Sequence, residues 1–511
     1  MTKNRVSIPP ISDRWSFLWL GIAAVLLVFT YGMYRNPLAG MLAYVFLLRF
    51  IRTQKTGRGY LLILLALIIA NTISWWNNMP TMPIPIKFIF GIVVGLLYSI
   101  PLLLDRLLVR RFQGFAATLV LPLAITAFEF LTLWPSPVTT FGSLAYSQFG
   151  NVYMTQVASI TGLWGVTFLV AWFASVVNWI WEEGAAWGRI WRGLAIYTGV
   201  MLIVMIYGVV RQSYFLPQPG TARIHGIVET DYTRYDWDTE IYPLSQTDPQ
   251  AFRAMMMPIY ERYLQSTVRE AQAGAQIVVW PEVAAEGFKE DLDAMLVRAR
   301  HIAQQEGIYL AVGLNLIGPN SGPEGENRLV IIDPRGEVVV NQLKYGCSSP
   351  RMYGFEIQTV NTPYGRLAGV ICCDLDYPYV VRQVSQKGVD ILLVPSFEPT
   401  AAQKLAHSQM APFRAVENGA SIFRLTAQGI SSAIDPYGRI QGSMDATRAD
   451  ERVFVVQLPD QRVFTIYSVV GELFGWLVVV GFVTIVILAI LQGRKTRTQA
   501  AASLAPQTHS A

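Results

Sequence analysis

The stretch from Ala368 to Pro378, Ala-Gly-Val-Ile-Cys-Cys-Asp-Leu-Asp-Tyr-Pro, contains the side chain with the clearest potential for covalent chemistry. Its small and β-branched residues predict a strand that ends at Cys372, and Pro378 suits the first turn of a following helix. A cysteine on such a sharp turn faces the substrate, while helix-end N–H groups lower its pKa and hold an oxyanion. The backbone N–H of Cys373 is the candidate donor to that oxyanion. A plainer interpretation stays open, in which both cysteines are small buried core residues.

Two further residues could assist a cysteine that attacks an acyl carbon, since that reaction needs a base for the thiol proton and a cation for the developing charge. Glu282 follows one predicted strand in Trp-Pro-Glu, and Lys344 ends another in Gln-Leu-Lys-Tyr. Because strand ends converge on one edge of a layered α/β fold, we expect Glu282 to accept the proton, Lys344 to stabilise charge and Cys372 to be the nucleophile. Taken singly, Glu282 could instead be a carboxylate at a helix N-terminus, and Lys344 an exposed charge at a hairpin end. Cys373 could also be the exposed thiol in place of Cys372.

The polar region that contains these residues alternates short β-rich runs with helical patterns, which indicates an α/β layered fold. The turn Asp333-Pro-Arg-Gly336 joins two of the runs in a strong hairpin signal. Predicted strands cover Arg223–Val228, Ile277–Trp280, Ile308–Leu314, Asn327–Ile332, Val338–Leu343, Glu356–Val360, Arg366–Ile371, Asp390–Pro395, Ser421–Ala427 and Arg452–Gln457. Predicted helices cover Pro249–Ala273, Asp291–Glu306, a segment from about Pro378, and Ala401–Glu417.

The composition is too apolar for an ordinary soluble protein, because 52% of the 511 residues are hydrophobic and only 15% are charged. Eight apolar runs are predicted to be membrane spans, at about Trp15–Tyr34, Pro37–Leu48, Tyr60–Trp76, Ile86–Leu104, Phe115–Trp134, Gln156–Trp181, Gly193–Val210 and Tyr467–Leu491. The second run is short and follows the first after only two residues, so it could instead be one arm of a re-entrant hairpin. The sequence therefore predicts a polytopic α-helical membrane domain joined to an α/β domain.

Basic residues between the apolar runs predict the orientation, because cytoplasmic loops carry an excess of positive charge. With the N-terminus inside, the inner segments hold clusters of Lys and Arg. The outer loops hold only Arg35 and Lys87, apart from Arg211 at the domain junction. We therefore predict a membrane domain with about seven transmembrane helices, an extracytoplasmic domain, a closing transmembrane helix and a cytoplasmic tail, over residues 1–211, 212–462, 463–492 and 493–511.

The segment from Trp134 to Gly165 lies on the predicted outer side and carries no charge from Pro135 to Thr155. Uncharged aromatic and amide groups suit the headgroup boundary, so an interfacial belt is the plain interpretation. Glu129 lies inside the fifth apolar run, where an ionisable residue is costly enough to indicate a functional or structural pairing. It could also reach water from the outer end of its helix.

The three cysteines all lie in the predicted external domain. Their odd number argues against a closed disulfide framework, although a bridge from Cys347 to Cys372 or to Cys373 stays open. The four His residues show no paired spacing with these thiols, and we expect neither a metal nor a cofactor. The net charge of +5 reflects membrane topology. Because basic residues do not cluster with aromatic residues on the polar domain, we expect no nucleic-acid partner.

Taken together, the motifs resemble the nitrilase, or carbon-nitrogen hydrolase, superfamily. The residues that look like its Glu-Lys-Cys triad and its downstream signature are Trp280–Glu282, Lys344, Ile371–Pro378, His407–Gly419, Arg424 and Gln428–Gly438. With the predicted spans and the outer segments Tyr146–Gln148, Gln156 and Gly162–Gly165, nearly the whole chain resembles the bacterial apolipoprotein N-acyltransferases. The resemblance implies that the external domain is a nitrilase-like αββα sandwich.

The same resemblance implies a two-stage acyl transfer. An acyl chain from a phospholipid would pass to Cys372 as a thioester, and then to the α-amino group of an S-diacylglyceryl cysteine at the N-terminus of an apolipoprotein. The location implied is the bacterial cytoplasmic (inner) membrane, with the catalytic domain on the periplasmic or extracellular side. Covalent catalysis of this kind predicts ping-pong kinetics.

The chain departs from the family pattern after the lysine. The family has a Val-Pro-Phe-Gly-Glu-like segment there, whereas Lys344 is followed by Tyr-Gly-Cys-Ser-Ser-Pro, so the second glutamate is absent. The nearest downstream carboxylate, Glu356, does not match in spacing, and Cys373 replaces the usual Tyr. Two alternatives therefore stay open: a membrane-tethered amidase or nitrilase-type hydrolase that uses water, and a catalytically degenerate binding homologue.

Overall fold

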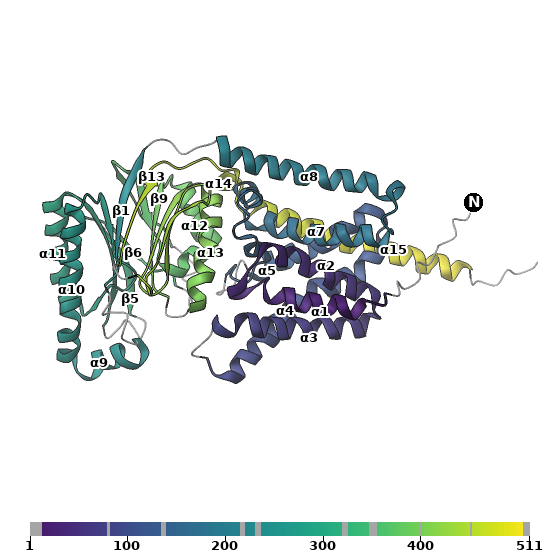
Figure 1. Ribbon diagram of the computed structural model, residues 1–511, viewed down its shortest axis with the longest axis horizontal. Coiled ribbons are helices and arrows are strands. Elements are labelled where there is room, and N and C mark those ends of the chain that lie inside the picture. The colour runs from purple at the N-terminus through teal and green to yellow at the C-terminus, as the bar shows by residue number, and fades with distance from the viewer. Residues whose placement is uncertain are drawn as a thin grey trace, which may run out of the picture.

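The computed structural model describes residues 13–78, 82–133, 139–214, 220–229, 237–318, 325–346, 355–398, 401–449 and 452–503. A bundle of long helices lies beside a domain of two packed sheets with helices on their outer faces (Figure 1). The last long helix of the chain returns to the bundle after the sheet domain. This arrangement confirms the predicted fold class of a helical membrane domain joined to an α/β domain.

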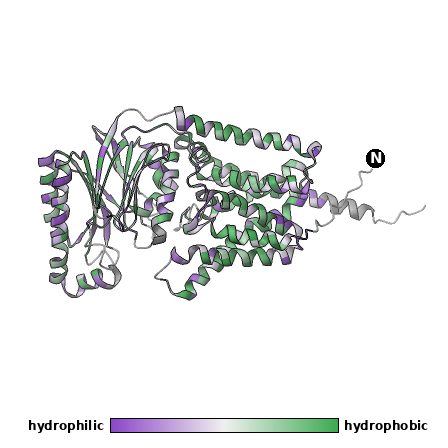
Figure 2. Ribbon diagram, in the orientation of Figure 1, coloured by the Kyte–Doolittle hydropathy of each residue, from purple (hydrophilic) through white to green (hydrophobic). Residues whose placement is uncertain are grey.

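The bundle helices coincide with the predicted apolar runs. Within the described residues, six helices are long and apolar enough to cross a membrane. They correspond to α3 (Thr56–Trp75), α4 (Ile84–Leu108), α5 (Val120–Leu133), α7 (Leu163–Glu182), α8 (Trp187–Tyr214) and α15 (Leu473–Ser503). Hydrophobic residues run along all of these helices (Figure 2). Helices α1 (Ser16–Val28) and α2 (Pro37–Thr53) have 13 and 17 residues, which is shorter than a hydrocarbon core of about 30 Å requires at about 1.5 Å per residue.

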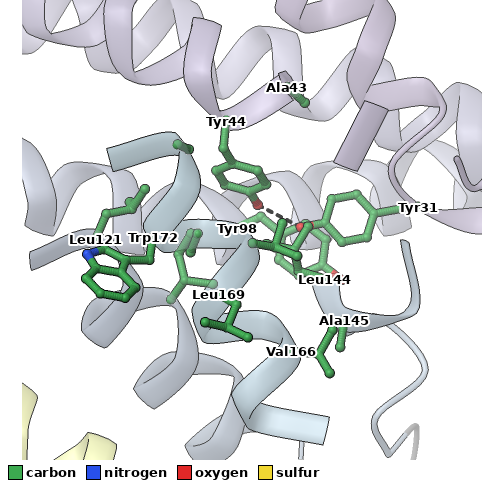
Figure 3. Close-up of a cluster of buried hydrophobic side chains, with 14 of the residues drawn as sticks. Tyr31, Ala43, Tyr44, Tyr98, Leu121, Leu144, Ala145, Val166, Leu169 and Trp172 are labelled. Atoms are coloured by element: carbon green, nitrogen blue, oxygen red, sulfur yellow. Dashed lines mark hydrogen bonds between the residues drawn. The ribbon is translucent and has the colours of Figure 1, made fainter. Parts of the chain in front are cut away.

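Aromatic and small aliphatic side chains fill the centre of the bundle (Figure 3). The hydroxyls of Tyr31 and Tyr44 hydrogen-bond at 2.7 Å, and the ring of Tyr31 stacks on Tyr98 with centroids 4.7 Å apart. Arg52 and Asp105 form a buried ion pair at 2.9 Å. An unpaired polar group is costly in apolar surroundings, so these pairs fix α2 against its neighbours.

The sheet domain contains two sheets among the described residues. The first has the strand order β13-β1-β2-β4-β5-β6, with β3 paired to β4, and the second has the order β12-β11-β10-β9-β8-β7. The inner strands of each sheet run parallel, and the outer pairs run antiparallel. Parallel strands direct their carboxyl ends to the same edge of a sheet, which is where the predicted chemical residues lie.

The first sheet consists of β1 (Thr221–Ile227), β2 (Ile277–Val279), β3 (Ala285–Gly287), β4 (Tyr309–Leu316), β5 (Glu326–Ile332), β6 (Val338–Leu343) and β13 (Val453–Pro459). The second consists of β7 (Thr359–Thr362), β8 (Gly365–Gly369), β9 (Ile391–Ser396), β10 (Ser421–Thr426), β11 (Ile430–Ile434) and β12 (Ile440–Asp445). Helices α10 (Pro249–Gln272) and α11 (Lys289–Glu306) cover the first sheet, whereas α12 (Pro378–Gln386) and α13 (Ala401–Asn418) lie between the second sheet and the bundle (Figure 1). The predicted αββα sandwich is therefore present.

Most predicted strands and helices are confirmed within a few residues, but three strands were missed. Strand β3 is only three residues long, and β12 reads Ile-Gln-Gly-Ser-Met-Asp, which lacks the apolar alternation of a strand. Strands β11 and β12 are joined by Asp435-Pro-Tyr-Gly438, a turn with the same chemistry as Asp333–Gly336. Strand β7 begins at Thr359 rather than at Glu356.

A buried arginine on α13 connects the sheet domain to the bundle. Arg414 donates hydrogen bonds to the hydroxyls of Thr140 and Tyr146, at 2.8 and 2.7 Å, in the loop between α5 and α7, the predicted outer loop. Its Nε donates to the carbonyl oxygen of Leu375 at 3.2 Å, just beyond the predicted nucleophile, and it also pairs with Glu417. The outer loop and the segment after Cys372 are therefore held by the same side chain.

Candidate active site

The structure brings Glu282, Lys344 and Cys372 together where strands of the two facing sheets end. Glu282 follows β2 and Lys344 follows β6 in the first sheet, whereas Cys372 follows β8 in the second. The Nζ of Lys344 lies 2.5 Å from Oε1 of Glu282. The charges of Lys344 and Cys372 each act on the pKa of the other group. The convergence predicted from strand ends is therefore found.

Glu282 is held by two donors, Lys344 and Asn327. Its carboxyl group is buried, with 4% of the residue exposed, and Oε1 also accepts a hydrogen bond from the side-chain amide of Asn327 at 2.7 Å. Two residues earlier, the indole N–H of Trp280 donates to the Thr267 hydroxyl at 2.9 Å and anchors the end of β2. A turn and β3 follow Glu282 rather than a helix, so its interpretation as a helix N-terminal carboxylate is wrong.

Lys344 is a largely buried cation rather than an exposed charge at a hairpin end. Only 18% of its side chain is exposed, and its backbone N–H donates to the carbonyl oxygen of Asn327 at 2.9 Å. Burial lowers the pKa of its ammonium group, but the nearby Glu282, Cys372 and Asp374 outweigh burial and raise that pKa above its usual value. Lys344 therefore stays positively charged, and Asn327 orients both members of the pair.

Cys372 occupies a sharp turn between β8 and α12, as predicted. Its φ of +51° lies in the left-handed region, which is unusual for a residue other than glycine, and a short 3-10 turn, Cys372–Asp376, precedes α12. The thiol points toward the carbonyl oxygen of Phe397 at 3.6 Å. Burial and the charge of Glu282 raise the pKa of the thiol, against a hydrogen bond with His407 and the charge of Lys344, which lower it. The prediction of a lowered pKa is therefore wrong, because burial prevails, and the thiol needs a base.

The two adjacent cysteines differ in their bonding. Cys373 is disulfide-bonded, whereas Cys372 is free. A sulfur in a disulfide has no thiol proton to give up and cannot serve as a thiolate nucleophile. Of the two bridges that the sequence left open, the one through Cys372 is therefore excluded, while Cys347 lies outside the described residues.

Asp374 is an anchor that sequence reasoning missed. Its carboxylate accepts three backbone N–H groups, from Ile371 at 3.1 Å, Tyr345 at 3.1 Å and Gly346 at 3.0 Å. Burial raises its pKa to about 6, against the charge of Lys344 and these N–H groups, which lower it. Because Tyr345 and Gly346 follow the lysine directly, Asp374 ties that strand end to the nucleophile turn. Its place two residues after the cysteine was the available signal.

A histidine also lies beside the nucleophile. His407 on α13 had no predicted role beyond its place in the family signature. Its Nδ1 lies 3.0 Å from Oε1 of Glu398, and its Nε2 lies 3.3 Å from Oδ2 of Asp376. The ring also hydrogen-bonds the thiol of Cys372. Burial lowers the pKa of His407, but Asp376, the hydrogen bond with Cys372 and Glu398 together raise it to about 10. The imidazole is therefore protonated at neutral pH.

Two family models match the chain on either side of the domain junction. The apolipoprotein N-acyltransferase N-terminal domain matches residues 23–176, and the carbon-nitrogen hydrolase domain matches residues 246–464. The first match covers most of the helical bundle, and the second covers the sheet domain with all three predicted site residues. The chain belongs to the apolipoprotein N-acyltransferases.

Two named relatives align with most of the length of this chain. The apolipoprotein N-acyltransferase of Geobacter metallireducens is 26% identical over 428 residues, which cover 75% of this chain and 76% of the relative. Apolipoprotein N-acyltransferase 1 of Treponema denticola is 23% identical and covers 69% and 73% of the two chains. The solved structure of an amidase from Nesterenkonia sp. matches 48% of this chain and 94% of its own, at 23% identity and a TM-score of 0.36. The two acyltransferase relatives, together with the six helices long enough to cross a membrane, make the chain a multi-pass membrane enzyme of the acyltransferase family.

The outer loop of this acyltransferase is packed between its two domains. Gln156 donates to the carbonyl oxygen of Tyr437 in the sheet domain at 2.9 Å. The indole of Trp164 donates to Glu472 at the start of the last helix at 2.6 Å. These side chains are buried in protein, so the loop does not form the plain interfacial belt. The Trp-Pro-Ser-Pro stretch, residues 134–137, lies outside the described residues.

Glu129 of the acyltransferase has a structural pairing. Its carboxylate accepts hydrogen bonds from the hydroxyls of Ser143 at 2.8 Å and Thr167 at 2.9 Å, and from the backbone N–H of Leu144 at 2.9 Å. It therefore joins the C-terminal part of α5 to the loop and to α7.

Glu356 does not replace the glutamate that the family carries after its lysine. That side chain is 77% exposed and pairs with Lys387 at 2.6 Å on the surface. The segment between Gly346 and Phe355 lies outside the described residues.

Proposed function

We propose that this acyltransferase moves a fatty acyl chain from a phospholipid to the N-terminal α-amino group of S-diacylglyceryl-cysteine lipoproteins, through a thioester on Cys372. The observation that carries the proposal is the buried Glu282–Lys344 pair beside the free thiol. A thiol, a base and a cation in one buried site are the groups that acyl transfer through a thioester needs. The names of the relatives support the choice of donor and acceptor.

In the first step, the carboxylate of Glu282 takes the proton of the Cys372 thiol, and the thiolate attacks the ester carbonyl carbon of the phospholipid. Lys344 stabilises the negative oxygen of the tetrahedral intermediate, with the backbone N–H of Cys373 as a further candidate donor. The carbon–oxygen bond of the ester then breaks. Glu282 returns its proton to the leaving oxygen, so that a lysophospholipid departs and the acyl chain stays on sulfur.

In the second step, the α-amino group of the acceptor attacks the thioester carbonyl carbon. Glu282 takes a proton from the attacking nitrogen, the carbon–sulfur bond breaks, and an amide forms. The proton returns to the departing sulfur, which restores the free thiol. Because the first product leaves before the second substrate reacts, the kinetics are ping-pong.

We also propose that the catalytic domain, residues 212–462, lies on the periplasmic side of the membrane. Support comes from the excess of Lys and Arg in the opposite loops and from substrates that reside in the outer leaflet. A cysteine introduced at Lys289, whose side chain is 74% exposed, should react with an impermeant maleimide in spheroplasts. A cysteine introduced at Arg189, which is 66% exposed in the first turn of α8, should react only after lysis. The reverse pattern would overturn the orientation.

The catalytic proposal is tested by intact-mass analysis of the purified protein with phospholipid. The expected result is one acyl increment that hydroxylamine removes, that maps to Cys372 and that a diacylated lipopeptide discharges. C372S should keep its membrane insertion and form no such adduct. A hydroxylamine-sensitive adduct on C372S would show that the nucleophile is wrong, and release of free fatty acid without acylated lipopeptide would favour the hydrolase.

A further inference from the structure

A second cationic side chain lies against the nucleophile, on the helix that faces the membrane bundle. His407 belongs to α13, and its ring meets the ring of Phe141 in the outer loop edge-on, with centroids 5.4 Å apart. The same imidazole hydrogen-bonds the thiol of Cys372, and only 12% of its side chain is exposed. His407 therefore reaches the reacting sulfur from an element that carries none of the proposed triad.

Two carboxylates determine the protonation of this ring. Nδ1 lies 3.0 Å from Glu398, and Nε2 lies 3.3 Å from Asp376. A neutral imidazole has one N–H donor, so favourable contacts with two carboxylates require protons on both nitrogens. The ring is therefore an imidazolium cation, and its orientation is fixed from both sides.

The charges around the imidazolium balance. Glu398 also pairs with Arg424, a guanidinium on β10 that is fully buried. Two carboxylates, Asp376 and Glu398, thus face two cations, His407 and Arg424. A thiolate at Cys372 would add one negative charge next to a fixed positive one, without leaving any carboxylate unpaired.

Lys344 alone cannot stabilise the Cys372 thiolate at the start of the reaction. Its ammonium lies 2.5 Å from Glu282, and the carboxylate offsets its charge until Glu282 has taken the thiol proton. The hydrogen bond from His407 acts on the sulfur before that transfer. A charge-assisted hydrogen bond to an ionised group is about twice as strong as a neutral one, so it favours the thiolate over the thiol.

We propose that His407 is a further catalytic residue, a permanently protonated donor that stabilises the Cys372 thiolate as it forms and as it leaves the thioester. Asp376 and Glu398 are its positioning residues. His407 moves no proton itself, since the thiol proton goes to Glu282 and returns from it. The inference rests on the proposed role of Cys372 as the nucleophile.

The test is the pH dependence of Cys372 alkylation by iodoacetamide, measured on the full-length protein in detergent and read at the Cys372 peptide by mass spectrometry. H407Q removes the charge, and its kinetic thiol pKa should rise by about one unit or more, which is about a tenfold slower reaction at pH values below the pKa. H407K keeps a positive charge, and its profile should stay within about half a unit of the wild type. H301Q, a histidine exposed on α11, is the matched control and should change nothing.

The outcomes separate this inference from the proposed function. An unchanged profile in folded H407Q, with a normal acyl adduct on Cys372, would overturn the role of His407 alone. A shift in H407K as large as in H407Q would also overturn it, because shape rather than charge would then be responsible. If H407Q does not fold, H407N, which also removes the positive charge, is read in the same way. An acyl adduct on C372S would overturn both proposals.

Discussion

Arg414→Met is expected to destabilise the junction between the catalytic domain and the membrane bundle by about 3–5 kcal/mol. The guanidinium of Arg414 and the carboxylate of Glu417 are 0% and 1% exposed. Methionine fills a similar volume but removes the charge, so Glu417 would be left unpaired in the interior. The substitution also removes the donors to Thr140 and Tyr146, at 2.8 and 2.7 Å, and to the carbonyl oxygen of Leu375.

The magnitude follows from burial. Loss of one partner from a buried pair leaves an uncompensated charge, whereas an exposed pair contributes at most about 1 kcal/mol. In domains of this size, 1 kcal/mol shifts the midpoint of thermal unfolding by about 2–4 °C. R414M should therefore lower the apparent midpoint by roughly 6–20 °C. The matched control is Arg298→Met, which breaks an ion pair with Glu261 whose side chains are 51% and 41% exposed.

The assay is thermal unfolding of the full-length protein in detergent, followed by tryptophan fluorescence. A double variant, R414M with Glu417→Gln, removes both charges and should be less destabilised than the sum of the single variants. Strict additivity, or a loss in R414M no larger than in R298M, would refute the view that the junction depends on this pair.

The pH dependence gives a second check on the same variant. Burial already raises the pKa of Glu417 in the native protein, against the charge of Arg414, which lowers it, so removal of Arg414 should raise it further. A native carboxyl pKa above its unfolded value means that stability falls as pH rises through that interval. The deficit of R414M should therefore be larger at pH 8 than at pH 5.5, and equal deficits would exclude the unpaired carboxylate as its cause.

Three further predictions concern the site itself. Glu282→Gln can still accept the hydrogen bond of Asn327 but cannot take a proton, so acyl-adduct formation on Cys372 should fall by about 10²–10⁴-fold in a folded protein, as followed by intact mass. C372G should unfold at a higher temperature than C372A, with a difference of about 1–2 kcal/mol, because only glycine adopts the positive φ without strain; equal midpoints would contradict this. The pKa of His407 is about 10 in the folded protein, against about 6.5 unfolded, so its stabilising contribution is complete below pH 6.5 and is lost as pH rises through 10. The stability difference between wild type and H407Q should shrink over that range, as read from unfolding midpoints.

The convergence of the proposed triad could be predicted because it depends on strand ends alone. Glu282, Lys344 and Cys372 each follow a recognisable apolar run, and the strands of a layered α/β fold direct their ends to a common edge. The direction of the thiol pKa could not be predicted in this way, because it depends on how deeply the sulfur is buried and on which charge lies nearest. The histidine contact was inaccessible for a similar reason. His407 meets Cys372 through the placement of α13 on the second sheet, a tertiary relation that no local pattern encodes.

The surroundings of the predicted outer loop could not be predicted from its sequence either. Its uncharged aromatic and amide side chains suit a lipid headgroup region as well as they suit a protein interior. Only the presence of a partner, such as the carbonyl oxygen of Tyr437 for Gln156, decides between the two. Strands β11 and β12 were missed because most of their residues are small or polar, although the turn between them has the same Asp-Pro-x-Gly pattern as Asp333–Gly336.

The buried pair on α13 has a consequence for biogenesis. Thr140 and Tyr146 accept hydrogen bonds from Arg414, and the backbone N–H of Leu163 donates to Glu417 at 2.7 Å. These three residues are all translated before α13. The bundle helices α1 to α8 are therefore synthesised before Arg414, and α15 is synthesised after it. A catalytic domain without its bundle would expose the charges of Arg414 and Glu417, which are buried in the native protein, beside the carbonyl oxygen of Leu375 next to the nucleophile turn. We therefore expect the active site to mature only after the bundle has assembled.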